Sequence, residues 1–429
     1  MKQFLILIVL VLAGCGEQTP EEIYKRVKDS GTITDRQAEI LSKGNFFVFD
    51  VLTTITDEQV EILSKIRSLH LNGLTSITDE QAESLSKLQN LRLNGVTSLT
   101  DKQAESLSKV RGNVLSLSGL TSITDEQAES LSKFEGHLSL SGLTSINDQQ
   151  AAFFSNGDFM SFTLDGLTSI TNEQTESLSK VKGSLHLNGL TTITDQQAES
   201  LGNVETLILK GATSLTDKQA ESLSKVEGLL SLSGLTSITD EQAESLSKVK
   251  GHLSLSGLTS ITDEQAESLS NLEGRLFSLS GLTSITDLYA ELFAKGGFYH
   301  VFGLNRLTSI TDKQAESLSK VEELFLGGLT SITDDQAEIL SKVPRLILNG
   351  LTSITDEQAE SLSKVEDCLG LSGLTFITDA QAESLCQVKK LELNGLTLIT
   401  DQQAKILSKV KYLLISQSCQ PLIDKYKKQ

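Results

Sequence analysis

The chain has 429 residues, only three of them proline, and a formal net charge of −19. A chain of this length usually divides into two or three domains, but no change of composition marks a boundary between residues 31 and 415. The negative charge excludes a general nucleic-acid-binding surface, because such a surface needs clustered lysine and arginine side chains.

The N-terminus has the pattern of an export signal. Lys2 precedes an apolar run at residues 4–12, which is too short to span a bilayer comfortably. The run leads into Leu12-Ala13-Gly14-Cys15, which resembles the signal of bacterial lipoproteins, where the chain is cut before the cysteine and acyl chains are attached to it. The alternative is an ordinary secretory signal in which this cysteine is incidental.

The lipoprotein resemblance implies that residues 1–14 are a signal peptide and that Cys15 is the lipid attachment site. Several acyl chains together give stable membrane anchoring. Gly16 stands where an aspartate would favour retention in the inner membrane, so the resemblance implies an exported protein at the outer membrane or the cell surface. We expect residues 15–30 to form a lipid-anchored tether and an N-terminal cap, with an amphipathic segment at residues 21–27 covering the first repeat.

From Gly31 to Ile415 one unit recurs, written at residues 69–88 as LHLNGLTSITDEQAESLSKL, with 22 to 25 residues per copy. The same aspartate, replaced by asparagine in one copy, marks 17 copies: Asp35, Asp57, Asp79, Asp101, Asp125, Asp148, Asn172, Asp195, Asp217, Asp240, Asp263, Asp287, Asp312, Asp334, Asp356, Asp379 and Asp401. Units this short cannot bury a core alone and must stack on their neighbours. We therefore expect one elongated solenoid domain at residues 31–415.

Each copy predicts a short strand followed by a short helix. Leu69 and Leu71 alternate with polar residues, which is the pattern of a half-buried strand. Thr78 and Gln81 form a capping box at a helix start, where acidic residues are also favoured by the helix dipole. The side chains expected inside are Leu69, Leu71, Leu74, Ile77, Ala82, Leu85 and Leu88. The period predicts an α/β repeat solenoid, a curved stack with a parallel sheet on its concave face and short helices on its convex face.

The unit resembles the leucine-rich repeat family, most closely the cysteine-containing subtype of F-box adaptor proteins, through Leu69, Leu71, Ile77, Thr78 and Asp79. The resemblance implies this fold and a role in binding. Leu74 stands where the subtype has cysteine or asparagine, whose side chain hydrogen-bonds backbone groups of the turns. Leucine can only pack, so those groups need other partners. A lipoprotein signal indicates a bacterium, so we exclude a ubiquitin-ligase adaptor.

Three copies break the pattern in the same way. Gly44, Gly157 and Gly296 stand where valine or leucine usually ends the helix, and aromatic residues follow them. Glycine at this place predicts a left-handed helix cap. Four aromatic side chains of these copies are hard to place inside: Phe153, Phe159, Phe298 and Tyr299. They either fill the space left by the missing aliphatic residue or form an exposed patch that binds a sugar or a protein.

The outward residue between the two strand leucines can be followed along the chain: His70, Arg92, Ser116, Ser139, Thr163, His186, Ile208, Ser231, Ser254, Ser278, Gly303, Phe325, Ile347, Gly370 and Glu392. Most of these side chains are short and neutral, and the stretch from Phe325 to Ile347 is more apolar. Solenoids of this class usually bind along this face. We therefore add His70, Arg92, His186 and Phe325 to the candidate binding residues.

No motif in the sequence predicts a catalytic site, a metal site or a cofactor. The five histidines lie in different copies, and those two strands apart would be separated by about 10 Å, too far to share a zinc ion. The repeated Asp-Glu pairs are adjacent at a helix start and do not face each other across a cleft, which disfavours acid–base catalysis.

The C-terminal part contains the remaining cysteines, Cys368, Cys386 and Cys419. They are too few for a disulfide framework, although a single bridge stays open. Residues 416–429 are expected to form the C-terminal tail, of which the polar residues 424–429 are expected to be loosely held.

These features favour an exported, lipid-anchored scaffold of the bacterial envelope that binds a protein or a polysaccharide. We expect a monomer without enzymatic activity, cofactor, metal or nucleic-acid partner. The alternative is a structural coat or spacer protein without a specific ligand. The near-identity of the copies fits either such a rod or a ligand that is itself repetitive.

Overall fold

The computed structural model of the chain describes residues 19–272, 277–295 and 302–427. The described residues form two compact units, which divide between Leu143 and Thr144. The lipoprotein signal with Cys15 lies outside the described residues, and so do the aromatic candidates Phe298 and Tyr299.

The first unit contains six helices and five strands in its described residues: α1 (Pro20–Ser30), α2 (Asp35–Leu41), β1 (Phe46–Val48), α3 (Asp57–Leu63), β2 (Ser68–His70), α4 (Asp79–Leu85), β3 (Asn90–Arg92), α5 (Asp101–Leu107), β4 (Val114–Ser116), α6 (Asp125–Leu131) and β5 (His137–Ser139).

The second unit continues the alternation through its described residues: α7 (Asp148–Ser155), β6 (Ser161–Thr163), α8 (Asn172–Leu178), β7 (Ser184–His186), α9 (Asp195–Leu201), β8 (Thr206–Ile208), α10 (Asp217–Leu223), β9 (Leu229–Ser231), α11 (Asp240–Leu246), β10 (His252–Ser254), α12 (Asp263–Ser270), β11 (Phe277–Ser278), α13 (Asp287–Lys295), β12 (Phe302–Gly303), α14 (Asp312–Leu318), β13 (Glu323–Phe325), α15 (Asp334–Leu340), β14 (Arg345–Ile347), α16 (Asp356–Leu362), β15 (Cys368–Gly370), α17 (Asp379–Leu385), β16 (Lys390–Leu393), α18 (Asp401–Leu407), β17 (Tyr412–Ile415) and α19 (Gln420–Lys427).

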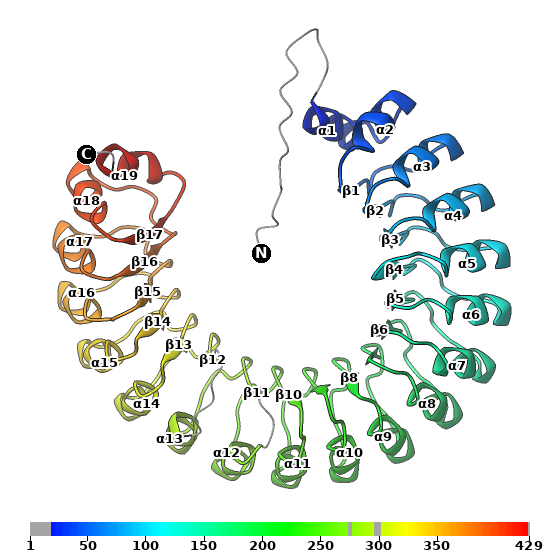
Figure 1. The fold of residues 1–429 in the computed structure, drawn as a ribbon. Coiled ribbons are helices and arrows are strands. Elements are labelled where there is room, and N and C mark those ends of the chain that lie inside the picture. The colour runs from blue at the N-terminus through cyan, green and yellow to red at the C-terminus, as the bar shows by residue number, and fades with distance from the viewer. Residues whose placement is uncertain (1–18, 273–276, 296–301, 428–429) are drawn as a thin grey trace. The chain divides into compact units, whose positions relative to one another are not determined.

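Neighbouring strands are parallel and follow chain order. This holds for β1 to β5 in the first unit. It also holds for β6 to β11 and for β12 to β17 in the second unit. In each unit the strands lie on one side and the helices on the other (Figure 1). The chain is therefore an α/β repeat solenoid, as the period predicts.

The helix starts confirm the capping prediction. Every copy marker in the described chain is the first residue of a helix, from Asp35 in α2 to Asp401 in α18. In α4, the hydroxyl of Thr78 accepts from the backbone N–H of Gln81 at 3.0 Å, and the Thr78 N–H donates to Gln81 Oε1 at 3.1 Å. The helices are short, and no helix in the described ranges is long and apolar enough to cross a bilayer.

The core consists of the side chains that the repeat predicts. In the copy at residues 69–88 all seven expected positions are buried, and the most exposed of them, Ile77, keeps only 8% of its surface accessible. Equivalent leucines pair across the strands, as Leu69 does with Leu91 and Leu91 with Leu115. Each large apolar side chain that is fully buried contributes roughly 1.5–3 kcal/mol before the entropy of ordering is subtracted.

The capping glutamine also joins each copy to the one before it. In α5, Gln103 Nε2 donates to the carbonyl of Ile77 at 2.9 Å while Oε1 accepts from the Thr100 N–H. Fourteen such amide–carbonyl bonds in the described chain measure 2.7 to 3.0 Å. The sequence predicts the cap but not this second bond, which satisfies a backbone carbonyl inside the stack.

One described helix departs from this arrangement. In α13, Tyr289 stands where the other helices from α2 to α18 carry glutamine. Its ring is buried and lies 5.5 Å from the ring of Phe293, centroid to centroid. Burial raises the pKa of the Tyr289 hydroxyl, so this group stays protonated.

The repeated aspartates have a structural role as well. The hydroxyl of Thr78 donates to the carboxylate of Asp57 in the preceding copy at 2.9 Å, and Thr100 does the same with Asp79 at 3.1 Å. The residues at the helix starts thus form a second ladder of hydrogen bonds between copies. Much of the negative charge therefore follows from stacking rather than from a cation-binding role.

Asparagine two positions before Leu74 supplies part of the backbone hydrogen bonding that leucine cannot. Asn72 Oδ1 accepts from the N–H of Asn94 at 3.1 Å, and Asn94 Oδ1 accepts from the N–H of Ser118 at 3.2 Å. The second unit repeats this contact, where Asn188 Oδ1 accepts from the N–H of Lys210 at 2.9 Å. The polar position of the turn is shifted relative to the subtype that the sequence resembles.

The aromatic copies do not use a left-handed cap, so that expectation is wrong for the two described glycines. Positive φ occurs at Gly31, where it ends α1, but not at Gly44 or Gly157. A Cβ at Gly157 would lie 2.2 Å from the ring of Phe159, and one at Gly44 would lie 2.7 Å from the ring of Phe47. Glycine is needed there because a phenylalanine ring occupies the space of its side chain.

Helices cover the described chain at both ends. Ile23 and Val27 of α1 are buried against the first copy. At the other end, α19 packs beside α18 and buries Ile423, and its Lys425 and Tyr426 bond the carboxylate of Asp401 at 2.8 and 2.7 Å. The prediction of a loose tail is therefore wrong for residues 424–427, because they belong to α19 and bond Asp401 of the last repeat.

We predict that Gln103→Ala destabilises α5 by about 1–3 kcal/mol, since it leaves the buried Ile77 carbonyl and the Thr100 N–H without partners. Native-state hydrogen exchange at the α5 amides measures the loss. Glu105→Ala is the matched control, because it removes only an exposed ion pair with Lys109 and should cost no more than ~0.5 kcal/mol. Equal effects of the two substitutions would contradict the bridging role of the glutamine.

Candidate functional site

The outward strand side chains form columns that run across the sheets. The register pairs His70 with Arg92, and Arg92 with Ser116, and it continues in the same way in the second unit. A second column, which precedes the first strand leucine, includes Ser68 and Asn90. These positions alternate with the buried leucines, so their side chains lie on the opposite face of the sheet from the leucine core.

In the first unit, His70 and Arg92 are neighbours on this face. The His70 ring lies 5.1 Å from the ring of Phe46 in an edge-on arrangement. Burial lowers the pKa of His70, the positive charge of Arg92 lowers it further, and Asp50 opposes both. The imidazole is therefore held in its neutral form on a small, partly apolar surface.

Serine lines the face of β9 to β11 in the second unit. The hydroxyls of Ser231, Ser233, Ser254, Ser256 and Ser278 form a continuous chain with neighbouring oxygens 2.9 to 3.2 Å apart. These hydroxyls satisfy one another, so the surface is flat, neutral and repetitive. His186 on β7 is also engaged, since its Nε2 lies 3.2 Å from the hydroxyl of Ser161.

The face of β13 to β17 differs from this pattern. We define the β13–β17 face by its outward side chains in the two columns: Glu323, Phe325, Arg345, Ile347, Cys368, Gly370, Lys390, Glu392, Tyr412 and Leu414. No residue type other than glutamate occurs twice in this set. The inward leucines of β13 to β16, by contrast, are all buried, and Leu413 of β17 is half-buried. The variation thus falls on the face of the sheet opposite the leucine core, although Ile347 and Cys368 in this set are themselves buried.

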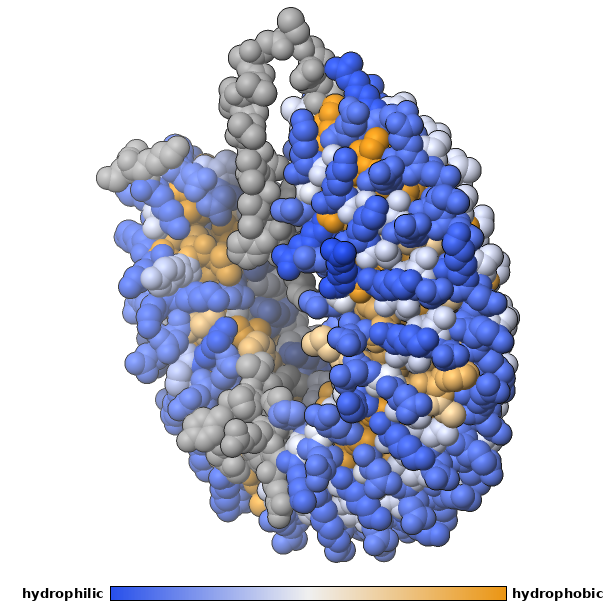
Figure 2. All heavy atoms as spheres, turned by 45° about the vertical axis from the view of Figure 1, so that its right-hand side comes forward, coloured by the Kyte–Doolittle hydropathy of each residue, from blue (hydrophilic) through white to orange (hydrophobic). Residues whose placement is uncertain are grey.

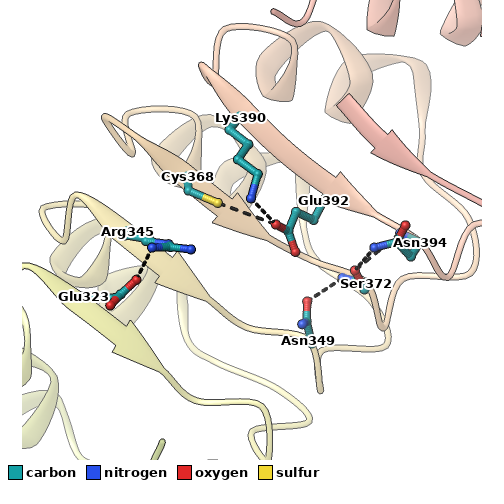
Figure 3. A network of polar contacts seen from close by, with 8 residues as sticks. All are labelled: Glu323, Arg345, Asn349, Cys368, Ser372, Lys390, Glu392 and Asn394. Atoms are coloured by element: carbon teal, nitrogen blue, oxygen red, sulfur yellow. Dashed lines mark hydrogen bonds and ion pairs between the residues drawn. The ribbon is translucent and has the colours of Figure 1, made fainter. Parts of the chain in front are cut away.

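Charged side chains on the β13–β17 face are paired (Figure 3). Arg345 forms an ion pair with Glu323 on the adjacent strand. Lys390 Nζ lies 2.6 Å from Glu392 Oε1 on the same strand, and this hydrogen bond raises the pKa of Lys390. Pairing leaves little net charge on the face.

The thiol of Cys368 lies next to the Lys390–Glu392 pair, with Sγ 3.9 Å from Glu392 Oε1 (Figure 3). Burial raises the pKa of this thiol, which therefore stays protonated. Cys368, Cys386 and Cys419 are all free thiols. Among the described residues, no group of three or more histidine, cysteine or acidic side chains could hold a metal ion.

Apolar side chains lie between and beside the charged pairs. A Cβ at Gly370 would lie 2.8 Å from Cδ1 of Ile347, so the glycine leaves room for Ile347, which is only 7% exposed. Phe325 is half-buried beside it. On the last strand, Tyr412 and Leu414 are about half exposed, at 54% and 47%. The β13–β17 face thus combines apolar anchors with neutralised charges.

Polar side chains continue this face where the strands end (Figure 3). Asn349 Oδ1 accepts from the backbone N–H of Ser372 at 2.9 Å, and Asn394 Nδ2 lies 3.2 Å from the Ser372 hydroxyl. These bonds hold the turns of three neighbouring copies in register, and they give the face a polar margin.

The remaining residues that the sequence predicts to bind a partner differ in their exposure. Phe159 is only 2% exposed and stacks on Phe162 at 4.7 Å between ring centroids, so it fills the core and is not available to a partner. Phe153 is half-buried on α7. Arg92 is exposed and Phe325 belongs to the β13–β17 face. The prediction of an exposed aromatic patch is therefore wrong for Phe159.

Sequence reasoning missed half of the β13–β17 face. The column containing Glu323, Arg345 and Lys390 was not among the expected binding positions, although it repeats two residues before the other column. The same period applied to the residue before the first strand leucine identifies it.

We predict that Arg92→Ser raises the pKa of His70 and that Asp50→Asn lowers it, because the first removes a repelling and the second an attracting charge. Titration of the imidazole by NMR measures both shifts. With the folded pKa below 6.5, the unfolded state binds the proton more readily, so the free energy of unfolding falls as pH drops from 6.5 towards the folded pKa. Arg92→Ser should weaken this dependence, and a parent midpoint at or above 6.5 would contradict the account.

No protein-family model matches the chain, and no curated protein matches it. Similar solved structures include a leucine-rich-repeat protein of Leptospira interrogans, with 20% identity over 85% of this chain and 93% of that chain and a TM-score of 0.43. They also include an internalin (inlF) of Listeria monocytogenes, with 15% identity over 92% and 93% and a TM-score of 0.33. A complex of TLR13 with ssRNA13 matches at 17% identity over 82% and 57%, with a TM-score of 0.47. These sequence identities and TM-scores are too low to support an argument, so the fold is established by the strand register and the helix starts of the chain itself.

Proposed function

We propose that the chain is a non-catalytic binding scaffold of the bacterial envelope, held at the membrane by acylated Cys15, and that it recognises a protein or a glycan through the β13–β17 face. It acts as a monomer and needs no cofactor. One observation carries the proposal. The inward positions of β13 to β17 keep the leucines of the repeat, while the outward positions carry a set of side chains that differs from strand to strand.

The chemistry of the β13–β17 face fits macromolecular recognition better than catalysis. Phe325, Tyr412 and Leu414 offer apolar surface area. Aromatic side chains are enriched among the interface residues that contribute most of the binding free energy. The Glu323–Arg345 and Lys390–Glu392 pairs supply directional polar groups without strong net charge. A partner therefore needs an apolar segment flanked by hydrogen-bonding groups.

The support for anchoring comes from the sequence. Leu12-Ala13-Gly14-Cys15 follows an apolar run, and Gly16 after the cysteine fits the outer membrane or the cell surface. Export would place the β13–β17 face where envelope proteins and polysaccharides are accessible.

A second candidate is a structural spacer without a specific ligand. The serine-lined face of β9 to β11 favours it, because these hydroxyls already bond one another and present a uniform surface. A spacer requires only stiffness and solubility, and on the side that Figure 2 shows the surface is mainly hydrophilic.

We predict that Cys15→Ala abolishes incorporation of a labelled fatty acid and moves the protein from the membrane to the soluble fraction, since the thiol is the proposed acylation site. Fluorescent detection of the labelled chain in fractionated cells measures both effects. Cys386→Ala is the matched control and should retain the label. A Cys15→Ala protein that still carries fatty acid would refute the anchor.

We predict that Phe325→Ser combined with Leu414→Ser weakens binding to a captured envelope component at least about tenfold, the loss from removing a central apolar contact of ~1.4 kcal/mol or more. Serine occupies the equivalent column at Ser231 and Ser254, so the fold tolerates it. Binding is measured on immobilised full-length protein with proteins and polysaccharides from the envelope.

The matched control is Met160→Ser, which changes a side chain that is 59% exposed on another part of the second unit. It should leave binding unchanged. If neither the parent nor the control retains any envelope component, the spacer function is favoured instead.

A further inference from the structure

The loop between strand and helix changes character in the last two copies. The residue before the loop isoleucine or leucine is serine or threonine in every earlier copy: Thr32, Thr54, Ser76, Ser98, Ser122, Ser145, Ser169, Thr192, Ser214, Ser237, Ser260, Ser284, Ser309, Ser331 and Ser353. In the last two copies it is Phe376 and Leu398. We call these two side chains the apolar ridge.

The apolar ridge is exposed and continuous. Phe376 is 63% and Leu398 is 78% exposed, which are the highest values among the large apolar side chains of the described residues. The two loops run side by side, since the Thr397 N–H donates to the Thr375 carbonyl at 3.1 Å. The core does not need these side chains, because the adjacent Ile377 and Ile399 are each only 5% exposed and fill the interior.

Negative charge is reduced around the apolar ridge. Ala380 and Gln402 stand at the helix position that carries Glu80 in the copy at residues 69–88, as uncharged or basic residues do in several earlier copies, and both are exposed. The carboxylate of Asp401, three residues after Leu398, is bonded by Lys425 and Tyr426 of α19. Loss of acidic residues and pairing of the remaining carboxylate both remove repulsion towards an anionic partner.

The C-terminal end is also basic in a strongly acidic chain. Residues 386–429 contain eight lysines and three acidic residues, against a net charge of −19 for the whole chain. Lys425 and Lys427 are exposed on α19, the helix that bonds Asp401 next to the apolar ridge. Apolar side chains combined with nearby lysines are the two features that attract a folded protein to an anionic lipid surface.

We infer that the apolar ridge docks on an anionic lipid bilayer, with Phe376 and Leu398 entering the boundary between headgroups and acyl chains. Lys427 contacts lipid phosphates while Lys425 stays bonded to Asp401, and a long lysine side chain can do so while its methylene groups stay at the boundary. This contact is separate from the acyl anchor proposed at Cys15, because it is made by the folded repeats.

A second copy of the chain fits the apolar ridge less well. The equivalent loop position is polar in all earlier copies, and another molecule would offer a surface of net negative charge. An anionic bilayer matches both the apolar and the basic component, whereas self-association matches only the first.

The absence of tryptophan from the chain allows a direct test. Leu398→Trp places a single fluorophore on the apolar ridge, and Ser237→Trp places one at the same loop position of an earlier, polar copy. Both full-length variants are reconstituted with vesicles of equal parts phosphatidylcholine and phosphatidylglycerol, or of phosphatidylcholine alone. Flotation reports whether the chain is on the vesicles, and emission with brominated lipids reports contact of the probe with acyl chains.

Lipid docking predicts a shift of the Leu398→Trp emission to shorter wavelength and quenching by brominated lipids in the anionic vesicles. Ser237→Trp should show neither effect, and added salt or neutral vesicles should weaken both effects for Leu398→Trp. Flotation without any change of Leu398→Trp emission would overturn the ridge contact while leaving the anchor intact. Failure of both variants to float would overturn both proposals.

Two further outcomes separate the alternatives. A shift of Leu398→Trp emission without lipid that grows with protein concentration would show self-association and overturn lipid docking. In a Cys15→Ala background, Phe376→Ser combined with Leu398→Ser should lower flotation with anionic vesicles relative to Met160→Ser. The two serines restore the residue type of the other copies, so an unchanged thermal transition is expected, and equal flotation of the variants would refute the inference.

Discussion

The structure depends on the side-chain amide of the capping glutamine. Its oxygen accepts from the N–H of the threonine that begins its own helix, and its nitrogen donates to a carbonyl of the preceding copy. Helices of seven residues are too short to be stable alone in water, so each must be fixed by its neighbour. The glutamine amide both caps its own helix and bonds that helix to the preceding copy. The threonine–aspartate bonds reinforce the same junction, and they explain why a stacked chain of this kind is so acidic.

The repeated features were predictable from the sequence because they depend on neighbouring residues in the chain or recur in the same way in every stacked copy. The capping box of Thr78 and Gln81, the burial of Leu71 and the parallel register all follow from the period. The missed features depend on distances between neighbouring copies, which the sequence does not give. Whether Gly157 permits a left-handed turn or leaves space for the Phe159 ring is decided by such a distance. The same holds for the docking of α19 on Asp401.

The separation of core and surface positions explains where function can reside. Leucines at every second strand position hold the fold, so the alternate positions can vary more widely than the leucines do. They are used differently along the chain, as a self-bonded serine surface on β9 to β11 and as a varied surface on β13 to β17.

The replacement of glutamine by Tyr289 has a mechanical consequence. An amide bridge fixes both the distance and the angle between two copies, whereas Tyr289 packs its ring against Phe293 of its own helix, and non-directional burial of this kind tolerates small rotations. In a stack that behaves as a one-dimensional array, cooperativity is lost first at its weakest junction. We therefore expect the second unit to bend most readily at the junction between α12 and α13, and heating to separate the helices there first.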